Sequence, residues 1–352
     1  MEEQAPSIID VAHRAGVSVA TASRVMGHSP YPVSEKARQK VLSAAAELNY
    51  TPNSLARSLR TQRSSLIAVL VGDNTDPYFA EIARGVEEVA KDHGYLTIIC
   101  NTERDPAKEL HYMRSLQDNR IDGVIFASSG LNIPGHIEAL DEIVQRMRKR
   151  GAGITTLSQH TLQVPSIQAD NFGGARQMTA RLLALGHQRI AFVAGPSDLL
   201  VANVRLQGYM SALVEAGCAI DPALILPGNF TRQGGEQAIS RLAYFLPEQR
   251  PTAIFAANDE TAFGVLQGLA RQGKRVPTDF SVCGFGDLPV AQLVTPALTS
   301  VHIPLRQLGR NGARSLFALL DKKDVPVLEM LPTTLAERET TGPFTEKIAP
   351  EL

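Results

Sequence analysis

The sequence lacks the features that would place a protein in or across a membrane. No stretch of about 18 or more apolar residues occurs along the chain, which excludes a membrane-spanning helix. The N-terminus, MEEQAPSIID, is acidic and has no basic region followed by an apolar one, so it does not resemble a secretory signal. We therefore expect a cytoplasmic protein with no membrane partner.

Cysteine is scarce as well. Cys100, Cys218 and Cys283 are far apart, and an odd, scattered set argues against a disulfide framework and against a metal site. The eight His residues are scattered too, with no ligand spacing. We interpret the three cysteines as packing residues and expect neither a metal nor a cofactor.

The motifs of several enzyme classes are missing. There is no GxxxxGK[ST] phosphate loop, no GxSxG nucleophile elbow and no HExxH metal pair. Asp259 and Asp287 can be imagined as a carboxylate pair, but solitary acids at the edge of a cleft usually bind hydroxyl groups. We expect that this protein is not an enzyme.

What the sequence does contain begins with an uneven charge distribution. Residues 1–63 hold eight Lys and Arg against five Asp and Glu, a net charge of +3, whereas residues 64–352 hold 27 against 31. A basic module on an acidic body fits nucleic-acid binding at the N-terminal end. Many solvated surfaces also reach +3, so the charge indicates only where to look.

From Leu66 onward, apolar runs alternate with amphipathic helical stretches, whereas the first fifty residues show short helices and no strand pattern. The strand-like runs are 66–71, 96–100, 123–127, 154–157, 189–193, 253–257 and 281–285. Short apolar strands separated by helices indicate α/β architecture with buried parallel sheets. Their number favours two α/β lobes that break near residue 160, with a ligand between them at the carboxyl ends of the strands. A binding protein, a sensor and an enzyme all use such a fold.

The stretch Ser7–Met26 predicts a helix-turn-helix. Ser7 and Asp10 make a helix start, Gly16 ends that helix, and Ser18 begins a second one. Small or apolar residues, Val11, Ala15, Ala22 and Val25, fall where the two helices would cross. A third helix, 34–48, supplies Val41, Leu42, Ala45 and Leu48 as a core face. The alternative interpretation is an amphipathic helix pair within a larger all-α domain.

The outward face of the second helix would lie in the major groove of DNA. Arg24 suits guanine, because a guanidinium group can donate to both O6 and N7. Val19 and Ala20 would contact thymine methyl groups or simply permit close approach. The short hydroxyl side chains Ser18, Thr21 and Ser23 suit phosphate oxygens, which fix register rather than sequence.

At this point the residues carry a family resemblance. DVAHRAGVSVATASRVM and VSEKARQKVLSAAAELNYTPNSLARSLR resemble the DNA-binding head of the LacI/GalR repressor family. DPYFAEIARGVEEVAKDHGY, RIDGVIFAS, DNFGGARQMTARLLALGHQRIAFVAG, PTAIFAANDETAFGVLQGLARQGKRVPTDFSVCGFGD and PALTSVHIP resemble its effector-binding core. The segments occur in the order and spacing of that family over nearly the whole chain. The core alone is also similar to periplasmic sugar-binding proteins.

The resemblance implies a domain plan. Residues 1–50 would form the helix-turn-helix head, 51–63 a hinge, and 64–352 the core. Within the core, the first lobe would comprise about 64–159 and 300–328, and the second about 160–299 and 329–342. In this family the hinge becomes a helix in the DNA-bound dimer, and a leucine from it enters the minor groove. Asn53, Ala56 and Leu59 occupy those positions here, and a disordered tether is the alternative.

The resemblance also implies an effector site in the cleft. The matching positions are Asn74, Tyr78, Phe79, Phe172, Asn203, Arg205 and Asp259. One of the two aromatic residues Tyr78 and Phe79 is expected in the core, and Asp259 would also suit a helix cap. Asn203 stands where many members have Arg, and Leu157-Ser158-Gln159 replaces Ile-Asp-Arg. Losing these charges favours a neutral polyol or nucleoside.

We therefore expect a ligand-responsive transcriptional regulator, a repressor that binds a pseudo-palindromic operator in double-stranded DNA as a homodimer. A sugar, polyol or nucleoside in the cleft would shift its affinity for DNA. The tail after Pro343 has no leucine heptads, so we expect no tetramer-forming coil. The alternative is a small-molecule binding or sensor protein of the sugar-binding type without a DNA function.

Overall fold

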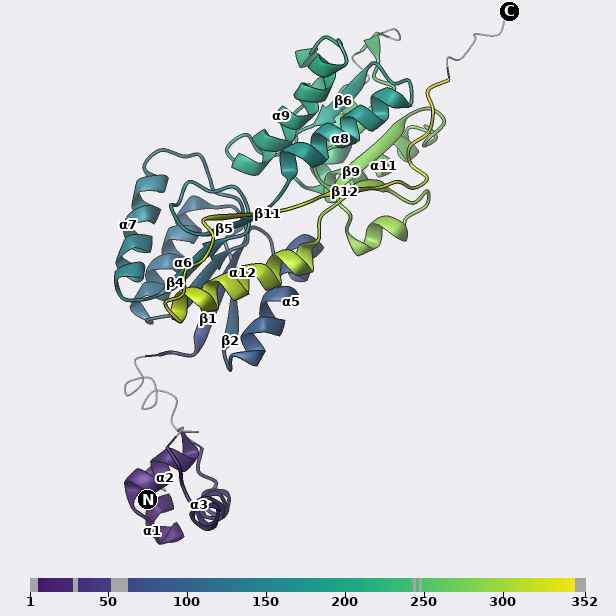
Figure 1. The fold of residues 1–352 in the computed structure, drawn as a ribbon. Helices are drawn as coiled ribbons and strands as arrows, with labels where there is room; N and C mark the ends of the chain where they lie inside the picture. Colours follow the sequence, from purple (N-terminus) through teal and green to yellow (C-terminus); the bar gives the residue numbers. More distant parts are fainter. Residues whose placement is uncertain (1–5, 28–30, 52–62, 243–244, 247–248, 346–352) are drawn as a thin grey trace, which may run out of the picture. The chain divides into compact units, whose positions relative to one another are not determined.

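The computed structural model describes residues 6–27, 31–51, 63–242, 245–246 and 249–345. They form two compact units, which divide between Ser65 and Leu66. Figure 1 shows helices in the first unit and two α/β lobes in the second. Each unit is described by itself below.

The first unit contains the predicted helix-turn-helix and the third helix. Its helices are α1 (Ile8–Ala15), α2 (Val19–Met26) and α3 (Glu35–Glu47). Ser7 caps α1 in a reciprocal capping box with Asp10, and Gly16 ends the helix in the left-handed region at φ 63°. Ala22 and Val25 pack against Val11 in a small core.

The prediction that Leu42 of α3 lies in the core is wrong, because this side chain is 45% exposed. Ala44, which the sequence analysis does not name, is buried beside Val41 and Ala45 instead. The reason is helical geometry: residues at positions i, i+3 and i+4 share a face, and Leu42 lies about 100° away from Val41 around the axis. Leu48 packs at the edge of the same core.

The second unit holds two six-stranded sheets. The first lobe contains β1 (Leu66–Val71), α5 (Pro77–Asp92), β2 (Leu96–Asn101), α6 (Pro106–Asp118), β3 (Gly123–Phe126), α7 (His136–Lys149), β4 (Gly153–Thr156), β5 (Ser166–Ala169), α12 (Leu305–Leu320) and β11 (Leu328–Leu331). The second contains α8 (Asn171–Ala184), β6 (Ile190–Val193), α9 (Leu200–Glu215), β7 (Ile225–Leu226), α10 (Arg232–Arg241), β8 (Ala253–Ala256), α11 (Asp259–Arg271), β9 (Ser281–Gly286), β10 (Thr299–His302) and β12 (Thr334–Ala336).

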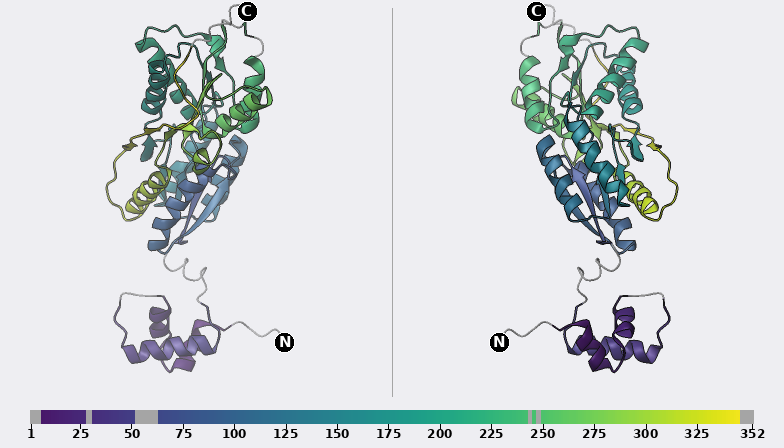
Figure 2. Two further views of the ribbon diagram at one scale, coloured as in Figure 1. Left: turned by 90° about the vertical axis from the view of Figure 1, so that its right-hand side faces the viewer. Right: turned by 90° about the vertical axis from the view of Figure 1, so that its left-hand side faces the viewer.

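Both sheets are doubly wound. The strand orders are β11-β5-β4-β3-β1-β2 and β12-β10-β9-β8-β6-β7, and the pairing is parallel except that β12 runs antiparallel to β10. Along β1 the side chains alternate between two buried faces, because successive strand residues point to opposite sides. Helices cover both faces of the first sheet, with α6 and α7 on one side and α5 and α12 on the other (Figure 2).

The polypeptide crosses between the two lobes at three places, and these crossovers differ from the predicted lobe boundaries. The first crossover lies at 169–171 rather than near 160, because β5 still belongs to the first sheet. The second follows β10, so strand 299–302 belongs to the second lobe, and the third follows β11, so 328–331 belongs to the first. Sequence analysis missed β5 because Ser166 and Gln168 interrupt its apolar pattern.

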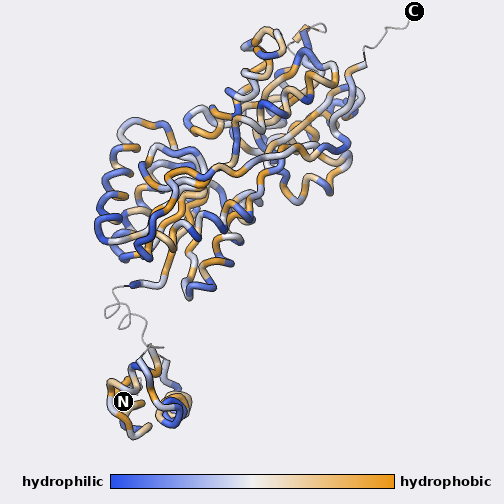
Figure 3. The backbone as a smooth tube through the Cα atoms, viewed as in Figure 1, coloured by the Kyte–Doolittle hydropathy of each residue, from blue (hydrophilic) through white to orange (hydrophobic). Residues whose placement is uncertain are grey.

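Hydropathy follows this architecture. Figure 3 shows apolar stretches along the central strands of both lobes. These strands are buried on both faces, as their continuous apolar runs predict. Within the described part of the chain, no helix is long and apolar enough to cross a bilayer.

Candidate functional site

The second helix of the head presents the residues predicted to meet DNA. Val19, Ala20 and Arg24 are exposed, whereas Ala22 and Val25 on the opposite side are buried. Thr21 and Ser23 are half-buried along the margins of this face. The local sequence therefore places small side chains and one arginine on a face that can approach a groove closely.

Two polar groups of this helix are already engaged. The Ser18 hydroxyl accepts a hydrogen bond from the Thr21 backbone N–H at 3.1 Å and lies 2.9 Å from the Thr21 hydroxyl. The Arg24 guanidinium lies 5.4 Å from the centre of the Tyr31 ring, a residue that sequence analysis did not select. Arg14 pairs with Glu47 at 2.7 Å and joins α1 to α3. The predicted hinge residues Asn53, Ala56 and Leu59 lie outside the described residues.

The core contains a pocket at the carboxyl ends of the strands, where both lobes contribute. We call it the cleft pocket. Its first-lobe lining is Asp76, Tyr78, Phe79, Arg104, Ala127, Ser128, Ser129 and Ser158, and its second-lobe lining is Leu199, Val201, Arg205, Phe230 and Asn258. Parallel strands bring these loops together because their carboxyl ends meet at one edge of each sheet.

Three predicted effector residues line the cleft pocket: Tyr78, Phe79 and Arg205. Phe79 is 7% exposed and belongs to the hydrophobic core, as was expected of one of the aromatic pair. The Tyr78 and Phe79 rings meet edge to face at 5.2 Å. Asp76 caps α5 by accepting a 2.9 Å hydrogen bond from the Tyr78 N–H. Burial of the Asp76 carboxyl raises its pKa to about 6.

Asp259 is not one of the residues that line the cleft pocket, although it interacts electrostatically with Arg205, which does. Its carboxylate accepts hydrogen bonds from the Ser300 hydroxyl at 2.5 Å and the Leu288 N–H at 2.7 Å, and it is 1% exposed. Burial raises the pKa of Asp259 to about 6. The alternative interpretation of Asp259 as a helix cap is wrong, since Asn258 caps α11 through the Thr261 N–H at 3.0 Å.

The other three predicted effector residues lie outside the lining of the cleft pocket. Asn74 exchanges two hydrogen bonds with Asn101, both at 3.2 Å. Asn203 donates from its side chain to the Ser197 carbonyl at 3.0 Å. Phe172 is 41% exposed at the start of α8. Their predicted roles as ligand contacts remain predictions.

Backbone hydrogen bonds join the lobes beside this pocket. Segment 129–132 of the first lobe runs antiparallel to segment 198–201 of the second, with a bridge between Leu131 and Leu199. Leu200 N–H donates to the Gly130 carbonyl at 3.2 Å, and Asn132 N–H donates to the Asp198 carbonyl at 2.7 Å. We call these two segments the interlobe latch. Ser129, Leu199 and Val201 belong to both the latch and the pocket lining.

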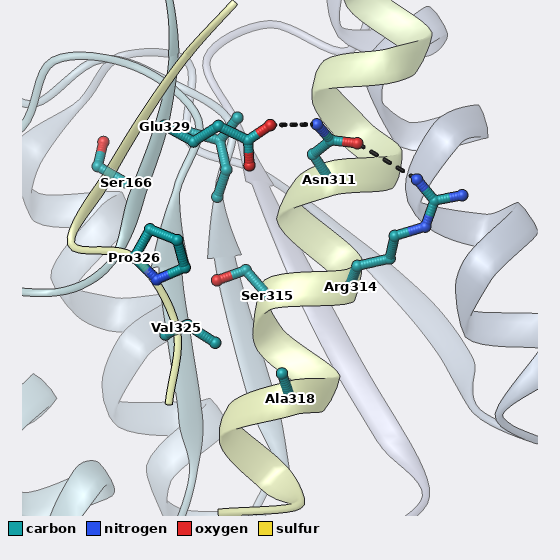
Figure 4. A pocket seen from close by; sticks show the side chains of 9 residues that line it. Ser166, Asn311, Arg314, Ser315, Ala318, Val325, Pro326 and Glu329 are labelled. Carbon is teal, nitrogen blue, oxygen red and sulfur yellow. Dashed lines mark hydrogen bonds between the residues drawn. The ribbon is translucent and has the colours of Figure 1, made fainter. Parts of the chain in front are cut away.

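Two other hollows lie within single lobes. Figure 4 shows a groove of about 320 Å³ between α12 and segment 325–329, in which Asn311 donates to Glu329 and accepts from Arg314. A hollow of about 600 Å³ lies near His187 and Phe344 in the second lobe. The cleft pocket, by contrast, draws its lining from both lobes, so a ligand bound there would contact both.

In the described residues, no group of three or more His, Cys, Asp or Glu is placed to hold a metal ion.

Family comparisons match both units. Residues 7–53 match the bacterial regulatory proteins of the lacI family, and residues 64–331 match the periplasmic binding proteins and sugar binding domain of the LacI family. The HTH-type transcriptional regulator DegA of Bacillus subtilis (strain 168) is 34% identical over 341 residues, which cover 96% of this chain and 98% of DegA. The HTH-type transcriptional repressor CytR of Escherichia coli (strain K12) is 34% identical over 91% of each chain.

Solved structures agree over most of the chain. The lac repressor dimer bound to operator and the anti-inducer ONPF superposes with a TM-score of 0.82 at 28% identity, covering 96% of this chain and 100% of that one. The complex of the transcriptional regulator CelR with cellobiose gives a TM-score of 0.69 at 33% identity, covering 95% and 99%. The relatives are transcriptional regulators, not enzymes. The protein is a ligand-responsive, DNA-binding transcriptional regulator, and the chain belongs to the LacI family.

Proposed function

We propose that this regulator is a repressor that binds a pseudo-palindromic operator as a homodimer. A small molecule in the cleft pocket would make that binding weaker or tighter. The observation that carries the proposal is the interlobe latch, because three of its residues also line the pocket. A ligand that fills the pocket therefore changes the free energy of the latch and shifts the population of lobe arrangements. Operator DNA lies in the cytoplasm, where this function would be exercised.

Strand β2 supports the homodimer. It forms one edge of the first sheet, and its side chains Leu96, Ile98 and Ile99 are 71%, 39% and 46% exposed. An exposed apolar edge strand is a liability unless another chain covers it. A second copy of this protein would bury the edge, and the lac repressor neighbour is itself a dimer on operator DNA. Two heads would then meet two half-sites.

Two observations support a sugar or a nucleoside as the ligand: the side chains that line the cleft pocket and the ligands bound by related regulators. The pocket offers hydroxyl groups from Ser128, Ser129 and Ser158, an amide from Asn258, and aromatic rings from Tyr78 and Phe230. Such a mixture suits a sugar or a sugar-containing nucleoside, since rings stack on apolar faces while hydroxyls exchange hydrogen bonds. A related regulator from Enterococcus faecium binds ribose, and CelR binds cellobiose. The comparisons give no support to a sensor without a DNA function.

The test begins with the full-length protein and a pool of random duplexes, from which binding selects an operator. Fluorescence anisotropy then measures operator affinity with and without each member of a library of sugars, sugar derivatives and nucleosides. A ligand that raises the unfolding midpoint binds the folded protein. We expect at least one stabilising ligand to change operator affinity about ten-fold or more, the range of typical allosteric coupling. Tight ligand binding with unchanged operator affinity would contradict the proposal.

A further inference from the structure

Arg24, the residue of α2 predicted to read a base, lies over an aromatic ring. The central carbon of its guanidinium group is 5.4 Å from the centre of the Tyr31 ring, which is within the range of a cation–π contact. Arg14 on the neighbouring helix differs, because it pairs with the Glu47 carboxylate at 2.7 Å. The two arginines of the helix-turn-helix are thus held by different kinds of partner.

An aromatic ring can hold a guanidinium group without using its hydrogen-bond donors. The attraction acts between the flat face of the cation and the face of the ring. The five N–H donors lie in the plane of the guanidinium group and point outward from its edges. The two donors that a guanine requires therefore stay available while the side chain of Arg24 is held in place. A carboxylate partner would occupy those same donors.

The segment that carries Tyr31 is fixed to the rest of the head. Val33 packs against the small core between the three helices. The Ser34 hydroxyl caps α3 by accepting a 3.3 Å hydrogen bond from the Ala37 N–H. Pro32 restricts the backbone of Tyr31, because a proline ring disfavours the helical conformation of the residue before it. The Tyr31 ring therefore has only a short connection to a fixed point.

The Tyr31 ring is unusually exposed. At 66% it is more exposed than Phe172 at 41% or Phe344 at 44%, the other large aromatic side chains that are exposed in the described chain. Such a ring contributes little to the core of the head. Its place beside the outward face of α2 accounts for it better than packing does, since that is the face predicted to meet DNA.

Resting on the operator binding proposed above, we propose that Tyr31 is a positioning residue that holds the Arg24 guanidinium ready to donate to a base. An unrestrained arginine side chain samples many rotamers, and fixing it on DNA costs conformational entropy. A ring that already holds the side chain in the unbound protein reduces that cost. The operator then binds more tightly although its own contacts are unchanged, and the gain is confined to DNA that carries the base read by Arg24.

The experiment measures the operator affinity of full-length Tyr31 variants by fluorescence anisotropy, without a ligand. Tyr31→Leu removes the ring and should weaken operator binding about two- to five-fold, the factor that corresponds to an exposed cation–π contact. Tyr31→Phe keeps the ring and is the matched control, so it should bind as the wild type does. Affinity for random duplexes should be equal in all three proteins, because phosphate contacts are unchanged. Their unfolding midpoints should also agree, since the side chain is exposed.

A double-mutant cycle separates positioning from a direct contact with DNA. In the Arg24→Ala background, Tyr31→Leu should cause no further loss, because no guanidinium group remains to be held. The base pair that Arg24 reads is the one whose replacement weakens the wild type but not Arg24→Ala. On an operator with that base pair replaced, Tyr31→Leu and the wild type should bind equally.

The contrary results are distinct. Equal losses in Tyr31→Phe and Tyr31→Leu would assign the effect to the hydroxyl group and overturn the proposal. A loss that persists in the Arg24→Ala background would show that Tyr31 acts on DNA by itself, and would also overturn it. Unchanged operator affinity of Tyr31→Leu would show that Arg24 needs no ring, with the same consequence.

The readouts separate positioning by Tyr31 from the proposed ligand response. If the cycle shows the expected coupling but no ligand changes operator affinity, the ligand response fails while the role of Tyr31 stands. If a ligand shifts the operator affinity of the wild type and of Tyr31→Leu by the same factor while the cycle shows no coupling, the role of Tyr31 fails while the proposed function stands.

Discussion

The hydroxyl of Ser129 in the first lobe accepts a 3.0 Å hydrogen bond from the backbone N–H of Val201 in the second lobe. The same hydroxyl donates toward the Gln159 carbonyl at 3.2 Å, within its own lobe. Ser129 is buried, and both it and Val201 line the cleft pocket. One side chain therefore links the interlobe latch to the lining of the cleft pocket, so its removal should weaken the contact between the lobes without altering the head.

Ser129→Ala tests this link. The substitution leaves the Val201 N–H without its acceptor, which costs about 1–3 kcal/mol when the group stays buried. We expect urea unfolding of the full-length protein to show a loss of about that size, or a more open core by small-angle X-ray scattering if the lobes separate instead. Ser240→Ala is the control, since among the described residues its hydroxyl donates to the Glu236 carbonyl of its own helix, at 3.3 Å. A variant with unchanged stability and unchanged dimensions would contradict the role of Ser129 in the latch.

Arg24→Ala tests sequence-specific recognition by the head. If Arg24 donates to a guanine, its loss should weaken binding to the selected operator by about 1–3 kcal/mol and leave non-specific affinity almost unchanged. Anisotropy titrations at several salt concentrations separate the contribution of base contacts from that of phosphate contacts, because phosphate contacts set the salt dependence. Arg14→Ala is the matched control, since its exposed ion pair with Glu47 should contribute at most about 1 kcal/mol. Equal losses on operator and random DNA would assign Arg24 to the phosphate backbone.

The residues that can be predicted from the sequence lie in helices and strands, whereas those that cannot lie on loops. Apolar positions recur with a helical period around Val11 and Ala22, and they form continuous runs in the central strands. Their burial can therefore be predicted from their spacing. Arg104 and Phe230 lie on loops at left-handed φ values of 57° and 64°, where no periodic pattern exists. They enter the cleft pocket only because the fold brings two distant loops together. The resemblance gave Tyr78, Phe79 and Arg205, since these lie on helices whose sequences match the family.

Strand β5 shows the same limit for lobe boundaries. Ser166 and Gln168 point to a half-buried face while Ile167 and Ala169 are buried, so the segment lacks the continuous apolar run of a central strand. Its place in the first sheet depends on pairing with β11, which follows about 160 residues later in the chain. Pairing between segments so distant leaves no local signal. The predicted boundary near residue 160 therefore lies one strand too early.

The crossing of α5 and α12 depends on glycine at the contact. A Cβ atom on Gly309 would lie 2.1 Å from the Ile82 carbonyl oxygen, and one on Gly85 would lie 2.1 Å from the Arg306 carbonyl oxygen. We expect Gly309→Ala to lower the unfolding free energy by about 1–3 kcal/mol, because the two helix backbones must separate. Ser315→Ala, on the same helix, removes a buried hydroxyl that has no partner among the described residues and should be neutral or stabilising. A stable Gly309→Ala protein would show that α12 shifts without loss of packing.

The raised pKa of Asp76 predicts a pH dependence of stability. The folded protein holds this proton up to about pH 6, whereas the unfolded chain releases it near the ordinary value of 3.8. Between these values the folded state binds more protons, so the contribution of Asp76 to stability falls as pH rises, by up to about 3 kcal/mol in all. Glu260 and Asp73 add to the rise in pKa, and Arg104 opposes it.

Asp76→Asn isolates that contribution, because Asn also caps helices and keeps an oxygen for the Tyr78 N–H. Urea unfolding at pH 4, 5, 6 and 7 should show the variant gaining stability relative to the wild type as pH rises. Other groups titrate in both proteins and cancel in the difference. Glu138→Gln provides the control, since that exposed side chain bonds the Gly135 N–H at the start of α7. If the difference between Asp76→Asn and the wild type stays constant from pH 4 to 7, the buried carboxyl ionises at its ordinary pKa, and solvent reaches it freely.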